Sequence, residues 1–451
     1  MSLIKMLFGR ENWFLVLVLI LVGLEQGIRI ATILLPNRIR LWFYNKSQRL
    51  YLWVFPELMC DGMVGAMCSA KDTVDLCGIH GYAVEEHFIR TSDGYLLCLH
   101  RIMPKIKPKQ SPSPRPPILF VHGLMMNSEV WVTNMKRKNN LPLVMCDEGY
   151  DVWLANLRGN KYSKKNSRYP SEKKDFWDFS LDNYIVFDIP ASIDYVLSVT
   201  NRDKINLVGF SQGSIILLAA MSMHPHSYKS VNALLAFAPT ISPKYYQSKI
   251  VQAIMNANSQ FLFLLFSRKS LLASVTFWQA VLYPPVFAKI IDLSLNFLLD
   301  WSSKNINDEQ KVVSLSHLYS FTSVKAFIHW TQIVRSKVIQ MFDDNPGPQT
   351  SYYTNLNRIA RYPVENIKLP ILTVYGASDS LVNIDVLKTV GDHFEDFIKV
   401  PNYEELDLLF GRNCYEDVYK PTLEKFNEIA RPQSSSSAST SSSKAARKVI
   451  A

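Results

Sequence analysis

Short apolar runs alternate with helix-like stretches between residues 118 and 239, and this alternation restricts the chain to one class of fold. Helical patterns at residues 184–199 and 214–223 lie between runs that resemble strands. Uninterrupted apolar runs are typical of strands buried on both sides in a parallel sheet. The runs are ILFVH (118–122), YDVWLAN (150–156), KINLVGF (204–210) and ALLAFAP (233–239). We therefore predict an α/β fold with a mostly parallel sheet and helices on both of its faces.

The sheet pattern extends beyond this region in both directions. Upstream, residues 82–102 hold two β-rich runs around Asp93-Gly94, a dipeptide typical of hairpin turns. Downstream, ILTVYG (371–376) and FIKVPNY (397–403) resume the strand pattern. Residues 241–350 instead carry apolar, aromatic stretches with helical character. We predict a helical cap there, inserted between two strands of a single domain at residues 37–432.

The two ends of the chain differ from this domain. The run WFLVLVLILVGL (13–24) has no charge, but it is shorter than the roughly 20 residues that span hydrocarbon. Extending it to Pro36 would enclose Glu25 and Arg29, which are costly in lipid. We predict that residues 1–36 form a membrane anchor or an in-plane helix. A cleaved signal peptide is the alternative, although no small-residue cleavage site follows the run. The serine-rich tail at 433–451 is expected to be disordered.

Composition excludes some classes of partner. The net charge of +10 and the pI of about 9.1 suit an anionic membrane or nucleic acid. The basic residues are scattered, however, and neither a zinc-finger spacing nor a stacking-aromatic motif is present, so we expect no nucleic-acid binding. The six cysteines form no CxxC pairs, and they are expected to be reduced structural thiols.

The sequence LVGFSQGS contains a candidate nucleophile. Gly209-Phe210-Ser211-Gln212-Gly213 matches the G-x-S-x-G pattern, follows an apolar strand and opens a small, apolar helix. This is the strand-turn-helix setting of a nucleophile elbow, in which the serine hydroxyl is exposed on a strained turn. Ser211 would then lie at a helix N-terminus, where backbone N–H groups favour developing negative charge.

Two further motifs match the other parts of such a site. In this arrangement, one oxyanion-hole N–H comes from the loop after an early strand and another from the residue after the nucleophile. Leu124, in His122-Gly123-Leu124, and Gln212 are the candidate donors, and His122 is expected to be structural. Asp379 follows the strand ILTVYG, which places it at the same sheet edge as Ser211 and in the required chain order for the acid.

Several longer stretches resemble the acid-lipase family of α/β-hydrolases, and most closely its membrane-anchored fungal steryl ester hydrolases. The resemblance covers residues 78–430 and includes HGYAVEEHFIRTSDGYLL, HGLMMNSEVW, GYDVWLANLRGNKYSKKN, GFSQGS and YGASDSLV. It implies an α/β-hydrolase fold that cleaves steryl esters, with acylglycerols as further candidates, to a fatty acid and an alcohol. It also implies a lipid-binding cap, no metal or cofactor, and a location on lipid droplets or the endoplasmic reticulum membrane.

The chain departs from this family at NYEELDLLFG (402–411), where Glu405 occupies the place of the family's catalytic histidine. That histidine takes the serine proton and passes it to the leaving alcohol, while the acid, here Asp379, orients it. A glutamate next to Asp379 places two carboxyl groups together, which raises the pKa of one of them. A carboxyl group that keeps its proton is a poor general base.

No other histidine is expected to fill this role. His393 keeps the required chain order, but it precedes the strand at 397–403, which at about 3.3 Å per residue places it roughly 20 Å away. His317 and His329 lie in the cap segment and are expected to be packing or surface residues. Two functions remain open: an ester hydrolase that uses Ser211, and a catalytically impaired lipid-binding protein that regulates or partners an active lipase relative.

Overall fold

The computed structural model describes residues 36–55, 61–104, 115–223, 229–245, 248–344, 359–390 and 396–430, together with Gly23 and Gly27. Apart from Gly23, Gly27 and Pro36, the expected anchor at 1–36 lies outside these ranges, as do the tail at 433–451, His393 and the end of the expected cap. The strands are β1 (Tyr82–Arg90), β2 (Tyr95–Pro104), β3 (Pro117–Val121), β4 (Asp151–Ala155), β5 (Lys165–Asn166), β6 (Ile205–Phe210), β7 (Val231–Phe237), β8 (Ile371–Gly376) and β9 (Asp396–Val400).

The helices before the cap segment are α3 (Asn37–Val54), α4 (Gly62–Ser69), α5 (Thr73–Ile79), α6 (Leu141–Asp147), α7 (Leu181–Asn183), α8 (Ile189–Thr200) and α9 (Gln212–Met223). Those within it are α11 (Lys249–Asn256), α12 (Ser259–Phe266), α13 (Ala273–Val281), α14 (Pro284–Leu299), α15 (Asp308–Leu318) and α16 (Val324–Ser336). The last three are α17 (Ile384–Val390), α18 (Asp407–Phe410) and α19 (Lys420–Ile429).

One sheet organises the described residues, in the strand order β1-β2-β4-β3-β6-β7-β8-β9, with β5 paired to β2. The pairs from β4 through β9 are parallel, and β1 and β2 form the antiparallel hairpin expected around Asp93-Gly94. The prediction of an α/β fold with a mostly parallel sheet is confirmed. Because parallel strands all end at the same edge, the loops after β3, β6, β7, β8 and β9 gather there.

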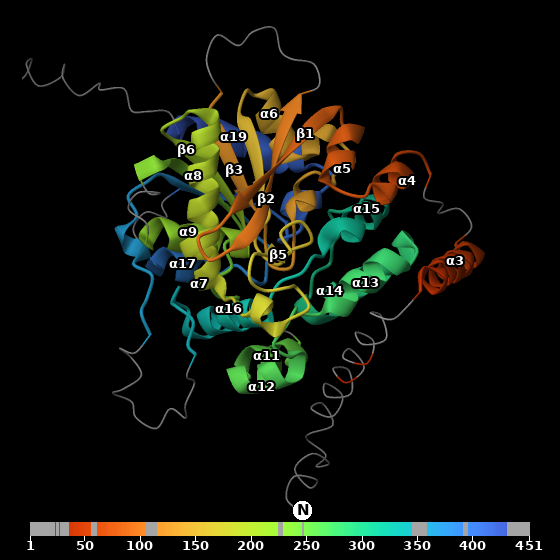
Figure 1. Ribbon diagram of the computed structural model, residues 1–451. Helices are drawn as coiled ribbons and strands as arrows, with labels where there is room; N and C mark the ends of the chain where they lie inside the picture. Colours follow the sequence, from red (N-terminus) through yellow and green to blue (C-terminus); the bar gives the residue numbers. More distant parts are fainter. Residues whose placement is uncertain are drawn as a thin grey trace, which may run out of the picture.

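Alternate residues of each strand enter two separate cores. In β3, Ile118 and Phe120 pack into the core on one face, while Leu119 and Val121 pack into the core on the other. Helices α6 and α19 cover the first face, and α8 and α9 cover the second (Figure 1). This explains the uninterrupted apolar runs, because a strand covered on both faces has no solvent side.

Helices α11 to α16 occupy chain between β7 and β8 and gather near one end of the sheet (Figure 1). They lie within the segment predicted to form a cap. Residues 37–80, for which no secondary structure was predicted, contain α3, α4 and α5, and α3 packs on α13 and α14. Among the residues that the structure describes, no helix combines the length and the hydropathy needed to cross a membrane.

A buried ion cluster ties the hairpin to the sheet edge. Arg158 is 1 % exposed, and its guanidinium donates hydrogen bonds to Asp188 at 2.6 and 2.8 Å and to Asp93. Arg158→Met would leave Asp188 charged and buried without its partner, so we expect it to lower the free energy of unfolding by about 3–5 kcal/mol. Urea unfolding of the detergent-solubilised chain, followed by tryptophan fluorescence, measures this.

Arg137→Met is the matched control, because Arg137 pairs with Asp147 at a site where 56 % and 38 % of the two side chains are exposed. Its loss should cost at most about 1 kcal/mol. Equal effects of the two substitutions would contradict a structural role for the buried cluster.

Candidate active site

Ser211 occupies the sharp turn between β6 and α9. It is a non-glycine residue with a φ of 53°, and its backbone N–H donates a 2.8 Å hydrogen bond to the Phe237 carbonyl of β7. Left-handed backbone at a serine is strained and persists only where the surroundings enforce it. Here β6, β7 and α9 hold it, so the geometry is that of a nucleophile elbow.

The glycines on either side allow this turn to close. A Cβ on Gly209 would lie 2.6 Å from Cα of Ser214, and a Cβ on Gly213 would lie 2.5 Å from the carbonyl oxygen of Val121. No side chain fits at either contact. The G-x-S-x-G spacing therefore reflects two close backbone approaches, one between β6 and α9 and one between α9 and β3.

The predicted oxyanion loop lies against the elbow. A Cβ on Gly123 would be only 3.4 Å from Cβ of Ser211, so the loop that carries the Leu124 amide passes beside the nucleophile. The amide of Gln212 is at the N-terminus of α9. Both predicted donors thus belong to segments that adjoin Ser211, as an oxyanion hole requires.

Both ring nitrogens of His122 are engaged in hydrogen bonds. Its Nδ1 donates to the Gly123 carbonyl at 2.9 Å, and its Nε2 accepts a 3.3 Å hydrogen bond from the Leu157 N–H. Burial lowers the pKa of His122 to about 4. The ring is therefore neutral, shapes the oxyanion loop and has no nitrogen left to accept a proton from Ser211.

The loops after β8 and β9 bring Asp379 and Glu405 to the same place. The Ser378 N–H donates to the Tyr403 carbonyl at 3.0 Å, and a Cβ on Gly376 would lie 2.1 Å from that same oxygen. These backbone contacts fix Glu405 beside Asp379. The Ser211 hydroxyl lies close enough to the Glu405 carboxyl to influence its pKa, so the structure brings Ser211, Asp379 and Glu405 together at one site.

Two neighbouring acids hold the Glu405 loop. The Glu404 carboxylate accepts hydrogen bonds from the backbone N–H groups of Ser302 (2.9 Å) and Ser303 (3.0 Å), which follow α14. The Asp407 carboxylate accepts one from the Glu404 N–H at 2.8 Å. The two adjacent glutamates therefore have different roles. Glu404 attaches the loop to the cap segment, whereas Glu405 contacts Ser211.

The two site carboxyls hold their protons more tightly than usual. Burial, and then the charge of Asp379, raise the pKa of Glu405 well above its ordinary range. Burial raises the pKa of Asp379 to about 7, although the Leu381 N–H and the charge of Lys244 oppose this. Asp379 Oδ2 and Glu405 Oε2 are both buried without a hydrogen-bond partner among the described residues. One proton shared by the pair is the state that such neighbouring carboxyls adopt.

Thr240 also contacts the nucleophile, and the sequence analysis missed it. Its Oγ1 lies 3.3 Å from Ser211 Oγ and donates a 3.0 Å hydrogen bond to the Ala238 carbonyl. Because the Thr240 proton goes to Ala238, Thr240 Oγ1 can act toward Ser211 only as an acceptor, in competition with Glu405 for the single Ser211 proton. The signal was present, because Thr240 follows the strand next to the elbow strand and so lies at the same sheet edge.

The cap histidines are engaged elsewhere. The Nδ1 of His317 is 3.0 Å from the Glu129 carboxylate, and its Nε2 donates to the Met67 carbonyl at 2.9 Å. His329 Nε2 donates to the Gln340 carbonyl at 2.7 Å. Among the described residues, no histidine is recorded bonding to Ser211, Asp379 or Glu405, and Glu405 is the titratable group that reaches the nucleophile.

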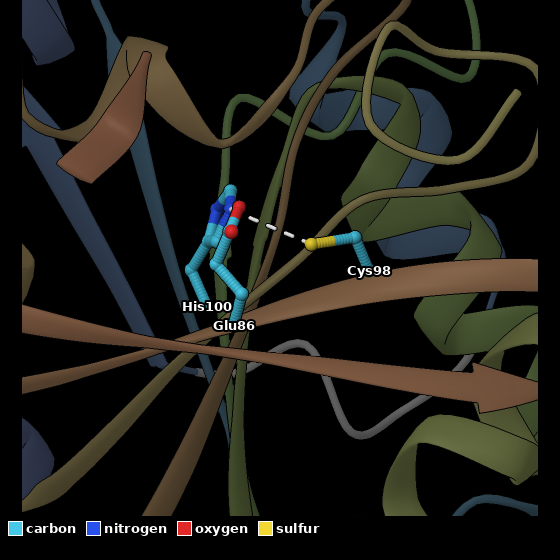
Figure 2. Close-up of side chains that lie close together, drawn as sticks. All are labelled: Glu86, Cys98 and His100. Atoms are coloured by element: carbon cyan, nitrogen blue, oxygen red, sulfur yellow. Dashed lines mark hydrogen bonds and ion pairs between the residues drawn. The ribbon is translucent and has the colours of Figure 1, made fainter.

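A possible metal-binding trio lies on the hairpin β1–β2, where Glu86, Cys98 and His100 point toward one another (Figure 2). The neighbouring groups favour a hydrogen-bonded network instead. Asn156 is oriented by a hydrogen bond that its Oδ1 accepts from Asn160, so its Nδ2 donates to His100 Nδ1. The ring proton is then on Nε2, which donates to Glu86 at 3.3 Å, and that nitrogen offers no lone pair to a metal.

Comparison with known proteins agrees with this geometry. Residues 116–411 match the family model described as alpha/beta hydrolase fold, and residues 73–135 match the partial alpha/beta-hydrolase lipase region. "Probable lipase C14C8.15" of Schizosaccharomyces pombe is 53 % identical over 91 % of this chain and 89 % of its own length.

Animal lipases are also similar to this chain. The human "Gastric triacylglycerol lipase" is 30 % identical over 77 % of this chain and 89 % of its own length. The "Lysosomal acid lipase/cholesteryl ester hydrolase" of Macaca fascicularis is 30 % identical over 80 % of this chain and 92 % of its own length. The chain belongs to the acid-lipase family of α/β-hydrolases.

Proposed function

We propose that this protein hydrolyses lipid esters with Ser211 as the nucleophile, and that steryl esters are its substrates. The observation that carries the proposal is the strained φ of 53° at Ser211, held between the oxyanion loop and the carboxyl pair. A turn with only a structural role would not require a serine in strained backbone next to two buried carboxyl groups. The printed names of two relatives, a triacylglycerol lipase and a cholesteryl ester hydrolase, indicate the substrate class.

The surroundings of the oxyanion loop suit an apolar substrate. Met125, in that loop, belongs to an apolar cluster with side chains of α12 and α16, which include Leu262, Leu265, Val324 and Ile328. Side chains of this kind exclude water and favour acyl or sterol groups. The cluster is continuous with the loop that carries the Leu124 amide, so an acyl chain bound there would place its ester near Ser211.

The carboxyl pair supplies the base in this proposal. When Asp379 and Glu405 share one proton, the pair carries one negative charge, and Glu405 accepts the Ser211 proton as Oγ attacks the ester carbonyl. The Leu124 and Gln212 amides stabilise the oxyanion. The pair then returns the proton to the leaving alcohol, and water, activated in the same way, releases the fatty acid. The pKa of Asp379, about 7, lets the pair change its protonation state near neutral pH, as general-base catalysis requires.

A second candidate function rests on the same glutamate. A buried carboxyl with a raised pKa that stays protonated would leave Ser211 without a base, and the chain would be a lipid-binding pseudo-lipase that regulates an active relative. That reading predicts a parent no faster than Ser211→Ala and a gain of orders of magnitude for Glu405→His. The hydrolase proposal instead predicts that the parent hydrolyses ester faster than Ser211→Ala.

We further propose that the enzyme works at a lipid-droplet or endoplasmic reticulum surface, to which residues 1–36 attach it. The support is the apolar run at 13–24, together with the lipid class of the substrate. No nucleic acid, metal or cofactor enters the proposed reaction.

Substrate comparison tests the proposal. The detergent-solubilised chain should hydrolyse cholesteryl oleate in mixed micelles, and faster than trioleoylglycerol, because we expect the rigid sterol ring system to bind the apolar side chains beside the oxyanion loop. Fatty acid release measured at equal substrate concentration gives the ratio. Faster release from trioleoylglycerol would overturn the sterol preference alone, whereas release from neither would overturn lipid ester hydrolysis.

A further inference from the structure

One side of α3 is apolar and exposed. Ile39, Trp42, Leu50 and Trp53 are 39 %, 55 %, 64 % and 81 % exposed. At about 100° per residue these four positions fall within roughly 80° of arc on the helix. They form an apolar stripe along α3 that Lys46 interrupts between Trp42 and Leu50, and two of its four members are tryptophans.

The side of α3 that adjoins the stripe is fixed to the cap segment. Phe43 makes an edge-on contact with Trp278 of α13, with ring centroids 6.0 Å apart, and Tyr44 makes a similar contact with Tyr283 at 5.9 Å. Ser47 Oγ accepts a 3.0 Å hydrogen bond from the Tyr283 N–H. These contacts set the rotation of α3 about its axis and leave the four residues of the stripe exposed.

The charge of α3 is entirely positive. The helix contains Arg38, Arg40, Lys46 and Arg49 and no acidic residue. On the helical projection Lys46 falls within the stripe and Arg49 falls beside it, and the Lys46 ammonium lies 6.0 Å from the centroid of the Trp42 ring. Exposed tryptophan beside lysine and arginine is the composition of helices that lie at the surface of anionic lipid.

The sequence before α3 and a neighbouring cap helix also favour contact with lipid. The apolar run at 13–24 ends twelve residues before α3 begins at residue 37. On α14, which packs beside α3 (Figure 1), Ile290, Leu293 and Phe297 are 48 %, 59 % and 68 % exposed and follow i, i+3, i+7 spacing. The cap helix that packs against α3 therefore also carries exposed apolar residues.

We propose that α3 lies in the plane of an anionic lipid surface, with its stripe among the acyl chains, and thereby holds the cap helices against the lipid that contains the substrate. The proposal rests on the proposed function only for its purpose, since binding to lipid does not require hydrolysis. A second copy of this chain and a protein partner are the other occupants that the stripe would accept, and the experiment distinguishes them.

Quenching by brominated phospholipid tests the proposal on the full chain, reconstituted into vesicles of phosphatidylcholine with about one third phosphatidylserine. Bromine on the acyl chains quenches only tryptophans that reach them. Trp42→Phe/Trp53→Phe keeps the stripe apolar but removes two of the nine tryptophans. We expect the double variant to lose at least half of the quenched emission, whereas Trp177→Phe, at a side chain 3 % exposed, should lose none of it. An unchanged quenched component in the double variant would overturn the proposal.

A second pair of variants connects the stripe to turnover. Trp42→Asp/Trp53→Asp should lower hydrolysis of vesicle-embedded ester at least tenfold and leave hydrolysis of a soluble p-nitrophenyl ester unchanged. Phe88→Asp is the matched control, because Phe88 is also 55 % exposed but lies on edge strand β1. A stripe shielded from aqueous quencher by self-association in the absence of lipid would contradict the proposal in favour of a second copy. No turnover of soluble ester by the parent would defeat the proposed function and leave the bromolipid result standing.

Discussion

Ser211→Ala is expected to reduce kcat/KM for ester hydrolysis by about 10³-fold or more, because the nucleophile is lost while the oxyanion donors remain. Thr240 is the nearest described hydroxyl, 3.3 Å from Ser211 Oγ. It is a poor substitute, since its own proton is donated to the Ala238 carbonyl. Release of p-nitrophenol from a short ester, which needs no lipid surface, measures the change.

Ser214→Ala is the control for this substitution. Ser214 lies one turn further along α9, and its Oγ donates a 3.0 Å hydrogen bond to the Phe237 carbonyl. The hydroxyl is removed from the same helix without touching the reacting atoms, so we expect less than a tenfold change. Similar losses in the two variants would mean that the effect is structural, and a fully active Ser211→Ala would remove Ser211 from the mechanism.

Glu405→Gln is expected to lower kcat by about 10²–10⁴-fold, the range for loss of a general base. The amide keeps the shape of the carboxyl but cannot take the Ser211 proton. The parent's rate should rise with pH through about 7, because the Asp379–Glu405 pair becomes an anion only as Asp379, with its pKa of about 7, loses its proton. The Glu405→Gln profile should lack this rising limb. Initial rates between pH 5 and 9 measure both effects.

Stability provides the control for Glu405→Gln. A carboxyl whose pKa is raised by folding stabilises the folded state fully below its unfolded pKa, and this stability is lost as pH rises through the folded value. Burial raises the pKa of both Asp379 and Glu405. The neutral amide should therefore melt at the same temperature as the parent or higher at pH 8. An inactive variant that also melts lower would leave misfolding as the cause.

The sequence predicted the parts of the site that depend on local pattern and chain order. The elbow at Ser211 follows from glycine spacing at the end of an apolar strand, and Asp379 follows from its place after β8. Thr240 was missed because a threonine after a strand carries no motif, and only the pairing of β6 with β7 places it beside Ser211. The raised pKa of Asp379 depends on how deeply the loop is buried, which the sequence does not encode locally.

The helix at residues 37–54 was not predicted because its packing also depends on tertiary contacts. Helix α3 has no buried residue, so its apolar positions do not follow the pattern of a helix that packs its apolar face into a core. Two aromatic sets share the helix, one packed on α13 and α14 and one exposed. The sequence alone does not show which aromatic residues pack on the cap helices and which are exposed. The structure separates them, and the exposed set is the basis for the proposed lipid contact.

Labelling by a p-nitrophenyl alkylphosphonate tests the central claim, that Glu405 activates Ser211, most directly. The reagent forms a stable adduct only on an activated serine, and peptide mass spectrometry locates it. We predict an adduct on Ser211 in the parent, formed faster as pH rises through about 7, and formed at least about 10²-fold more slowly in Glu405→Gln. Absence of the adduct from the parent, or equal labelling rates in parent and Glu405→Gln, would contradict the account.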